Sequence, residues 1–265
     1  MKPVICFDFD GTLVDSNGRI HPNDITILQN EERVVFVPAT GRPYHAVRHA
    51  FTRNGLLFED AIPYPMILQN GAVVYEPYQQ LWSHTPFPAA KQTKIIDIAQ
   101  RNPQVCCLLF GLHQLDILWP NEHSDKMVAR FNLDVQPYQA GNQRYTKITF
   151  IAGTHAALKA VVYEIKPLSV EAAFSLPTVY ELTPTDIDKG RMLQNLLIGM
   201  DLQNALLLAA GDGENDLSLF DVADVSFCPE NSILAVKERA NFSLNIAKTG
   251  LLQPMLEQAG LSLQK

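Results

Sequence analysis

The sequence predicts an α/β fold in which a parallel sheet is interrupted by an inserted α+β domain. The first observation is a set of short, β-prone apolar runs that each stop at a turn, as buried parallel strands do: Pro3 to Phe9, Val34 to Val37, Ala205 to Ala210 and Val225 to Cys228. The second is a helical pattern from Lys189 to Met200, in which apolar residues recur with a 3.6-residue period. The third is a different order of elements in the middle of the chain.

The middle of the chain places neighbouring strands beside helices, which is typical of an α+β arrangement and of a separate domain. We expect this domain at residues 83–182, with residues 1–82 and 183–265 forming the core and with linkers at residues 83–86 and 182–184. The helices expected in the insert are Ala89 to Arg101, Ser124 to Phe131 and Ala156 to Glu164. The strands expected there are Val105 to Leu109, Gln114 to Trp119, Tyr145 to Ala152, Val170 to Phe174 and Thr178 to Leu182.

Composition excludes several classes of protein. Of 265 residues, 47% are hydrophobic and 18% charged, as in an ordinary globular protein. The net charge of −7 disfavours nucleic acid as the main partner, because a polyanion needs a basic surface. The four cysteines have no metal-ligand spacing and are expected to be reduced core thiols, which fits a cytoplasmic chain. Apolar runs are too short for a signal-peptide core or a membrane span.

The densest group of reactive side chains is Asp8-Phe9-Asp10-Gly11-Thr12, directly after the first strand. Where the strand ends the chain turns, so both carboxylates can reach one point above the sheet. One ionised carboxylate can attack phosphorus while its neighbour donates a proton to the leaving oxygen. An Asp-Gly pair after an apolar run is also ordinary turn chemistry, so this motif alone leaves both readings open.

A second acidic group, Gly211 to Asp216, follows the strand that ends at Ala210. Asp212 can bind a cation or simply cap the next helix. Two acidic strand ends in one sheet favour the metal site, because Mg²⁺ prefers a few carboxylates together with water and substrate phosphate.

Positive charge and hydroxyl groups follow other strands. Thr40-Gly41-Arg42 comes after the strand near Val34, and a hydroxyl and an unhindered N–H there can hold phosphate oxygens. Lys189 opens a predicted helix. Because a phosphate monoester carries −1.5 to −2 charges, an acidic protein must gather cations locally, and Mg²⁺, Lys189 and Arg42 are the candidates.

Together DFDGT, ATGR, DIDKG and GDGEND, in this order, resemble the four motifs of the haloacid dehalogenase superfamily of phosphohydrolases. Only the gap between Thr40 and Lys189 is long enough to house a cap domain. An insert at this place resembles the type C2B cap of Cof-like phosphatases, and Gln69-Asn70-Gly71-Ala72 also resembles that group. The resemblance implies a Rossmann-like core with an inserted C2B cap.

The resemblance also implies roles for single residues. Asp8 would be the nucleophile that forms an aspartyl-phosphate, and Asp10 the general acid and then the base toward water. Mg²⁺ would be held by Asp8, Asp212 and the main-chain carbonyl of Asp10. Asp216 would orient the groups of the site without itself binding the ion. The groups expected to hold phosphoryl oxygens are Thr40, Gly41, Lys189, Asn215 and the backbone of Phe9. Arg42 and Asn70 are further candidates for substrate contact.

The expected function is therefore a Mg²⁺-dependent phosphatase of small phosphorylated metabolites, with sugar phosphates favoured and flavin mononucleotide and pyridoxal phosphate also open. Two alternatives remain: a phosphomutase of sugar phosphates on the same fold, and a non-catalytic metabolite sensor. Cap residues near Asp116, Trp119, His123 and Arg144 are candidates for reading the leaving group. The oligomeric state is not readable from the sequence.

Overall fold

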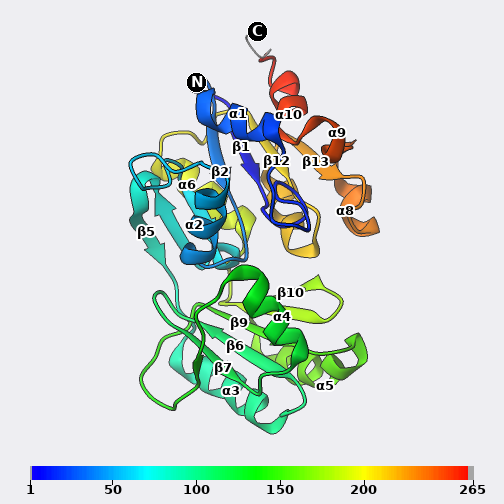
Figure 1. The fold of residues 1–265 in the computed structure, drawn as a ribbon. Helices are drawn as coiled ribbons and strands as arrows, with labels where there is room; N and C mark the ends of the chain where they lie inside the picture. Colours follow the sequence, from blue (N-terminus) through cyan, green and yellow to red (C-terminus); the bar gives the residue numbers. More distant parts are fainter. Residues whose placement is uncertain (1, 262–265) are drawn as a thin grey trace.

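The structure is a computed structural model that describes residues 2–261. The chain forms two parts (Figure 1): one is built on a five-stranded parallel sheet and the other on a six-stranded, largely antiparallel sheet. The second part comes from the middle of the chain, and the predicted range 83–182 is called the cap segment below. This is the α/β class with an added antiparallel sheet that the sequence predicts.

The parallel sheet holds the first part together, with strand order β14-β13-β12-β1-β2. Its strands are β1 (Val4–Phe7), β2 (Val35–Pro38), β12 (Leu207–Ala210), β13 (Val225–Pro229) and β14 (Phe242–Leu244). Four of them confirm the predicted strands, and β14 was not predicted. We expected β2 to end at Val37 because Pro38 lacks an N–H, but the strand includes Pro38. The ladder tolerates it because the neighbouring Ala39 N–H makes the bond to Phe7, so the Pro38 nitrogen faces away from β1.

Both faces of this sheet are buried, as alternation along β1 shows. Ile5 and Phe7 belong to one apolar cluster, and Val4 and Cys6 to another on the opposite face. The helices of this part are α1 (Pro22–Asn30), α2 (Tyr44–Arg53), α6 (Lys189–Gly199), α7 (Leu217–Val222), α8 (Leu234–Arg239), α9 (Ile246–Thr249) and α10 (Leu252–Gln258), with the 3-10 turn η4 (Glu214–Asp216). The helix predicted from Lys189 is confirmed as α6.

The cap segment contains the six-stranded sheet, in the order β10-β11-β9-β6-β7-β8. Its strands are β6 (Cys106–Phe110), β7 (Leu115–Leu118), β8 (Gln136–Pro137), β9 (Lys147–Ile151), β10 (Glu171–Leu176) and β11 (Val179–Thr183). Its helices are α3 (Ala89–Arg101), α4 (Glu122–Phe131) and α5 (His155–Ile165), followed by the 3-10 turn η3 (Lys166–Leu168). Every element predicted here is confirmed. Ala46 of α2 shares an apolar cluster with Leu108 and Phe110, so the two parts pack against each other.

A small antiparallel sheet, β3-β4-β5, was not predicted. It comprises β3 (Met66–Leu68), β4 (Val73–Glu76) and β5 (Gln80–His84), with the 3-10 turns η1 (Gln69–Gly71) and η2 (Pro77–Gln79). Strands β5 and β11 reach into the two expected linkers, and the domain boundaries stay predictions.

All four cysteines are buried and free of disulfides. None of the helices in residues 2–261 combines the length and the apolar composition needed to cross a bilayer.

Candidate active site

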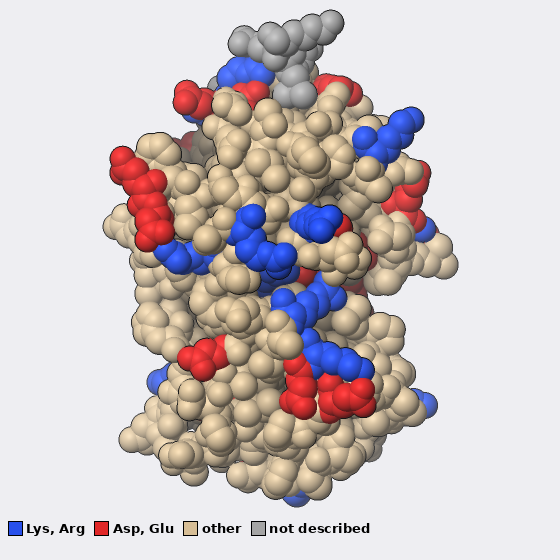
Figure 2. All heavy atoms as spheres, in the orientation of Figure 1, with Lys and Arg blue, Asp and Glu red and all other residues tan. Residues whose placement is uncertain are grey.

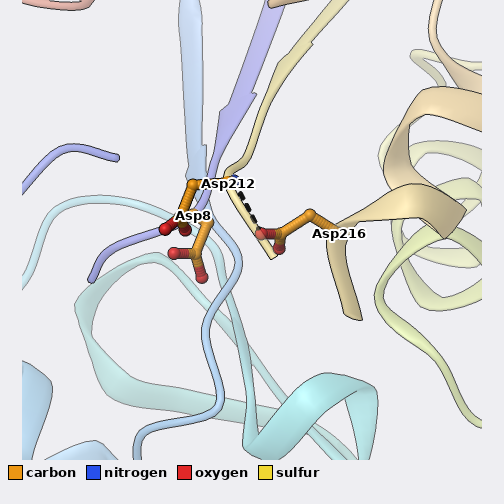
Figure 3. Close-up of side chains that lie close together, drawn as sticks. All are labelled: Asp8, Asp212 and Asp216. Carbon is orange, nitrogen blue, oxygen red and sulfur yellow. Dashed lines mark hydrogen bonds between the residues drawn. The ribbon is translucent and has the colours of Figure 1, made fainter. Parts of the chain in front are cut away.

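Three carboxylates converge at the carboxyl edge of the parallel sheet. Asp8 follows β1, Asp212 follows β12, and Asp216 ends the turn η4. An oxygen of each lies within 4.8 Å of an oxygen of the other two. Figure 3 shows Asp8 and Asp212 side by side, with the Asp216 carboxylate directed toward them. Parallel strands bring their carboxyl ends to one edge, which is why residues some 200 positions apart in sequence meet here.

Backbone geometry holds this cluster tightly. The Asp216 carboxylate accepts the N–H groups of Asp212 and Gly213, both at 3.0 Å, which closes the loop after β12. Gly11 has a φ of +83°, and a Cβ there would lie 2.4 Å from Asp212 Oδ2. Only glycine satisfies both the left-handed backbone and the close approach of the Asp212 side chain.

Lys189 neutralises part of the cluster. Its side chain is fully buried, and Nζ lies 2.6 Å from Asp8 Oδ1 and 2.6 Å from Asp216 Oδ1. Burial alone would lower the pKa of Lys189, but the carboxylates of Asp216 and Asp8 outweigh it, so the pKa is raised and the ammonium stays charged. Asp188 caps the helix that carries this lysine by accepting the Arg191 N–H.

Burial makes the ionised forms of Asp8 and Asp212 costly. Burial and the neighbouring Asp216 raise the pKa of Asp8 well above its usual range, and Lys189 offsets only part of this. Burial and Asp216 also raise the pKa of Asp212 to about 7. When all three carboxylates are ionised, the one ammonium leaves an excess of negative charge, and the donors are hard oxygens. This donor set fits a divalent cation such as Mg²⁺.

The Asp10 carboxylate lies outside this cluster. It is bound at both oxygens by Arg42, with Nε 2.7 Å from Oδ2 and Nη2 2.6 Å from Oδ1. Arg130 of α4 approaches from the cap segment, with Nη2 3.7 Å from Oδ1. The Arg42 guanidinium also stacks between the rings of Phe9 and Phe131. Arg42, expected to contact substrate, is thus the partner of Asp10 in this structure.

A cavity of about 420 Å³ joins these groups. Of the predicted site residues it is lined by Asp8, Asp10, Thr40, Gly41, Arg42, Asp212 and Asn215. Phe9, Asn70, Lys189 and Asp216 do not line it. Phe9 stacks on Phe51 beneath the site, and Asn70 accepts a hydrogen bond from Asn215 Nδ2 at 3.2 Å. The Thr40 hydroxyl accepts the Arg42 N–H at 3.2 Å.

Sequence reasoning missed a buried ion pair in the cap segment. Lys147 of β9 donates to Glu181 Oε1 at 2.8 Å and to the Gly41 carbonyl at 2.7 Å. Asn70 donates to the other Glu181 oxygen at 2.7 Å. Burial works against the ionised form, but Lys147 and Asn70 outweigh it and lower the pKa of Glu181. The sequence signal that could have indicated this pair was one charged residue, Lys147 or Glu181, in each of two strands that are otherwise uncharged.

Of the four cap residues suggested for reading the leaving group, His123 lines the cavity. The other three are engaged elsewhere. Asp116 is buried and accepts a hydrogen bond from the Tyr145 hydroxyl. The Trp119 indole N–H donates to the Ala99 carbonyl at 3.0 Å. Arg144 donates to the Phe87 carbonyl.

Comparisons with known proteins agree with the resemblance seen in the sequence motifs. The model of the haloacid dehalogenase-like hydrolase family matches residues 5–250. Among curated proteins, the chain is 23% identical over 260 residues to the 5-amino-6-(5-phospho-D-ribitylamino)uracil phosphatase of Bacillus subtilis, covering 91% of each. It is 23% identical over 259 residues to the pyridoxal phosphate phosphatase of Escherichia coli, covering 90% of this chain and 91% of that one.

Solved structures share the whole architecture. A crystal structure from Thermotoga maritima matches with a TM-score of 0.79 at 25% identity, covering 100% of this chain and 99% of the other. A sugar phosphatase of haloacid dehalogenase subclass IIB matches with a TM-score of 0.81 at 21% identity, covering 97% and 99%. The chain therefore belongs to the haloacid dehalogenase-like hydrolase family, as its four sequence motifs predict.

Proposed function

We propose that the protein is a Mg²⁺-dependent phosphatase of small phosphorylated metabolites that works through an aspartyl-phosphate on Asp8. The observation that carries this proposal is the convergence of Asp8, Asp212 and Asp216 around the buried ammonium of Lys189. Asp8 and Asp212 would hold the ion with their carboxylates, and Asp10 with its main-chain carbonyl. When bound, Mg²⁺ supplies charge that neutralises the phosphoryl oxygens. Asp216 orients Lys189 and the Asp212 loop.

The reaction takes two displacements. An Asp8 oxygen forms a bond to phosphorus while the bond to the leaving alcohol breaks, and Asp10 gives its proton to that alcohol. Asp10 then takes a proton from water, whose oxygen attacks phosphorus and releases inorganic phosphate and the Asp8 carboxylate. Thr40, Gly41, Asn215, Lys189 and the Phe9 backbone are the groups proposed to hold the phosphoryl oxygens.

Asp10 must be freed for this role. Both of its oxygens accept hydrogen bonds from Arg42, and an acid catalyst has to come within hydrogen-bond reach of the leaving oxygen. We infer that Arg42 holds Asp10 between turnovers and shifts when substrate enters. The cap segment supports closure over a small substrate, since it supplies much of the cavity wall.

The test is inorganic phosphate release from a metabolite panel containing Mg²⁺. The panel includes sugar phosphates, the class the sequence favours, and esters with flat rings such as pyridoxal phosphate and flavin mononucleotide, because curated relatives are phosphatases of such compounds. We expect Asp8→Asn and excess EDTA each to abolish release, while Asp97→Asn, on the exposed face of α3, leaves it unchanged.

Other outcomes would contradict the proposed mechanism or identify a different function. Activity that survives in Asp8→Asn or in EDTA would contradict the mechanism. An isomerised sugar phosphate formed only with a bisphosphate activator would identify a mutase, and binding without turnover a sensor. The net charge of −7 supports a small substrate rather than nucleic acid. The buried free thiols support a cytoplasmic location.

A further inference from the structure

Helix α4 gives the cavity a wall of mixed chemistry. Its residues His123, Lys126, Met127, Arg130 and Phe131 all line the cavity. They are spaced i, i+3, i+4, i+7 and i+8, so they form one stripe of the helix. Three of the five carry nitrogen groups that are or can become cationic, and two are apolar. The wall opposite the carboxylate cluster is therefore both basic and apolar.

The basic half of this stripe carries charge that the protein neutralises incompletely. The side chain of Arg130 is 47% exposed; among residues 2–261 it pairs with Asp10, at 3.7 Å, and its guanidinium lies over the Phe131 ring, 5.2 Å from the ring centroid. That carboxylate already accepts two hydrogen bonds from Arg42. The single Asp10 carboxylate thus pairs with two guanidinium groups. Lys126 forms an ion pair with Glu122 at the surface. Figure 2 shows basic side chains gathered where the two parts of the molecule meet.

Most of the cap-side wall outside the basic residues of α4 is apolar. Its apolar members are Phe110, Met127, Phe131, Leu133, Ile151, Leu176 and Val179, and its remaining polar members are Lys147, Ser175, Thr178 and Glu181. The carboxylate on this side, Glu181, is occupied by Lys147 and Asn70. A neutral sugar needs a partner for each buried hydroxyl, because an unpaired one costs free energy on leaving water. Outside α4, the hydroxyl groups that this wall offers as partners are those of Ser175 and Thr178.

We propose, on the basis of the proposed function, that the preferred substrates are phosphate monoesters whose alcohol combines an apolar ring or chain with a second anionic group. The apolar part would pack against Phe110, Met127 and Phe131. The anionic group, a carboxylate or a second phosphate, would bind the guanidinium of Arg130, which is the donor best matched to either. Neutral hexose phosphates are then poor substrates.

Matched esters test the proposal with one leaving-group chemistry. The probes are benzyl phosphate, 4-carboxybenzyl phosphate and the bisphosphate of 1,4-benzenedimethanol, with glucose 6-phosphate as the neutral sugar. We expect kcat/KM for at least one of the two anionic esters to exceed that for benzyl phosphate by about tenfold, the size of a charge-assisted hydrogen bond. Glucose 6-phosphate should be the poorest of the four.

The variants isolate Arg130. In Arg130→Gln the ratio of kcat/KM for the preferred anionic ester over benzyl phosphate should fall by about tenfold. Arg130→Lys should keep part of it. Lys159→Gln, which removes an exposed lysine of α5 that does not line the cavity, should leave the ratio unchanged. Using a ratio removes any general loss of activity from the comparison.

Several results would overturn the inference. These are equal kcat/KM for the charged and uncharged benzyl esters, a preference for glucose 6-phosphate, or the same ratio in Arg130→Gln as in the unaltered protein. If no ester is hydrolysed, the proposed function fails, and calorimetric binding of the same esters to Asp8→Asn still decides the inference. Equal affinity for the charged and uncharged esters would then refute it.

Discussion

On the core side of the cavity, in and behind its wall, the charged cluster around Asp8 is buried and paired, whereas on the cap side the charged groups of α4 are in contact with solvent. Lys189 is fully buried between Asp8 and Asp216, and Asp8 is only 8% exposed. Arg130 and Lys126 on α4 are 47% and 69% exposed. Groups that take part in bond making must be held in place before substrate arrives, because reorganisation during reaction costs rate. Groups that recognise a leaving group can remain hydrated until it binds.

The largest effect should come from the buried cluster on the core side. Lys189→Met leaves Asp8 and Asp216 buried without their cation, which should lower the free energy of unfolding by about 3–5 kcal/mol. Phosphate release should fall by about a thousandfold, since the charge that holds the phosphoryl group is lost. Urea unfolding and kcat/KM check this, with exposed Lys159→Met as the matched control. A variant with near-normal activity would remove Lys189 from the proposed site.

An intermediate effect is expected from Lys147, which is buried like Lys189 but belongs to the cap segment. Lys147→Met leaves the Glu181 carboxylate buried without its cation, which should lower the free energy of unfolding by about 3–5 kcal/mol. The double variant Lys147→Met with Glu181→Leu should recover much of this loss. Arg101→Met, from the exposed pair with Glu164, should cost less than about 1 kcal/mol.

Activity in Lys147→Met should fall by about tenfold, because the Gly41 carbonyl loses its partner. Urea unfolding of the two variants and the control separates the stability effect from the kinetic one. A double variant no more stable than Lys147→Met alone would show that the unpaired Glu181 carboxylate is not the source of the stability loss.

The smallest effect is the pH dependence of stability in the absence of metal. Burial and the neighbouring Asp216 raise the pKa of Asp212 from its ordinary value of 3.8 to about 7 in the folded protein, and that of Asp8 is also raised. The folded state therefore binds more protons than the unfolded chain between about pH 4 and pH 7, so the free energy of unfolding falls as the pH rises through this range. We expect a change on the order of 2 kcal/mol in EDTA.

Asp212→Asn separates this titration from those of the histidines. The variant should lose less stability than the unaltered protein between pH 5 and pH 7.5 in urea unfolding. Added Mg²⁺ should restore stability to the unaltered protein at the higher pH, because it binds the folded state with its carboxylates ionised. Identical pH profiles for the two proteins would contradict the raised pKa of Asp212.

The sequence predicts the chemical groups of the core well because strand ends in a parallel sheet share one edge. That rule places Asp8 near Asp212 with no knowledge of their distance. The elements of the cap segment were likewise predictable, since their apolar periodicity is strong, and α3 begins and ends at the predicted residues. The sheet β3-β4-β5 was missed although its strands, of three to five residues, are about as long as those of the parallel sheet, so strand length does not explain the miss. The Asn70-Gly71 pair after β3 was a turn signal that could have indicated it.

Contacts between the two parts were beyond sequence reasoning. The bond from Lys147 to the Gly41 carbonyl and the approach of Arg130 to Asp10 join residues that no shared sheet brings together. They depend on how the cap segment packs on the core. Periodicity assigns a residue to a face of its own element and says nothing about the element that will cover that face.

The most direct test is the position of a divalent ion in a crystal grown with Mg²⁺ or with Mn²⁺, whose anomalous scattering identifies it. We predict one ion bound by carboxylate oxygens of Asp8 and Asp212 and by the main-chain carbonyl of Asp10, at about 2.0–2.1 Å for Mg²⁺. An ion bound elsewhere, or an active enzyme whose Asp8 and Asp212 oxygens share no ion, would contradict the account.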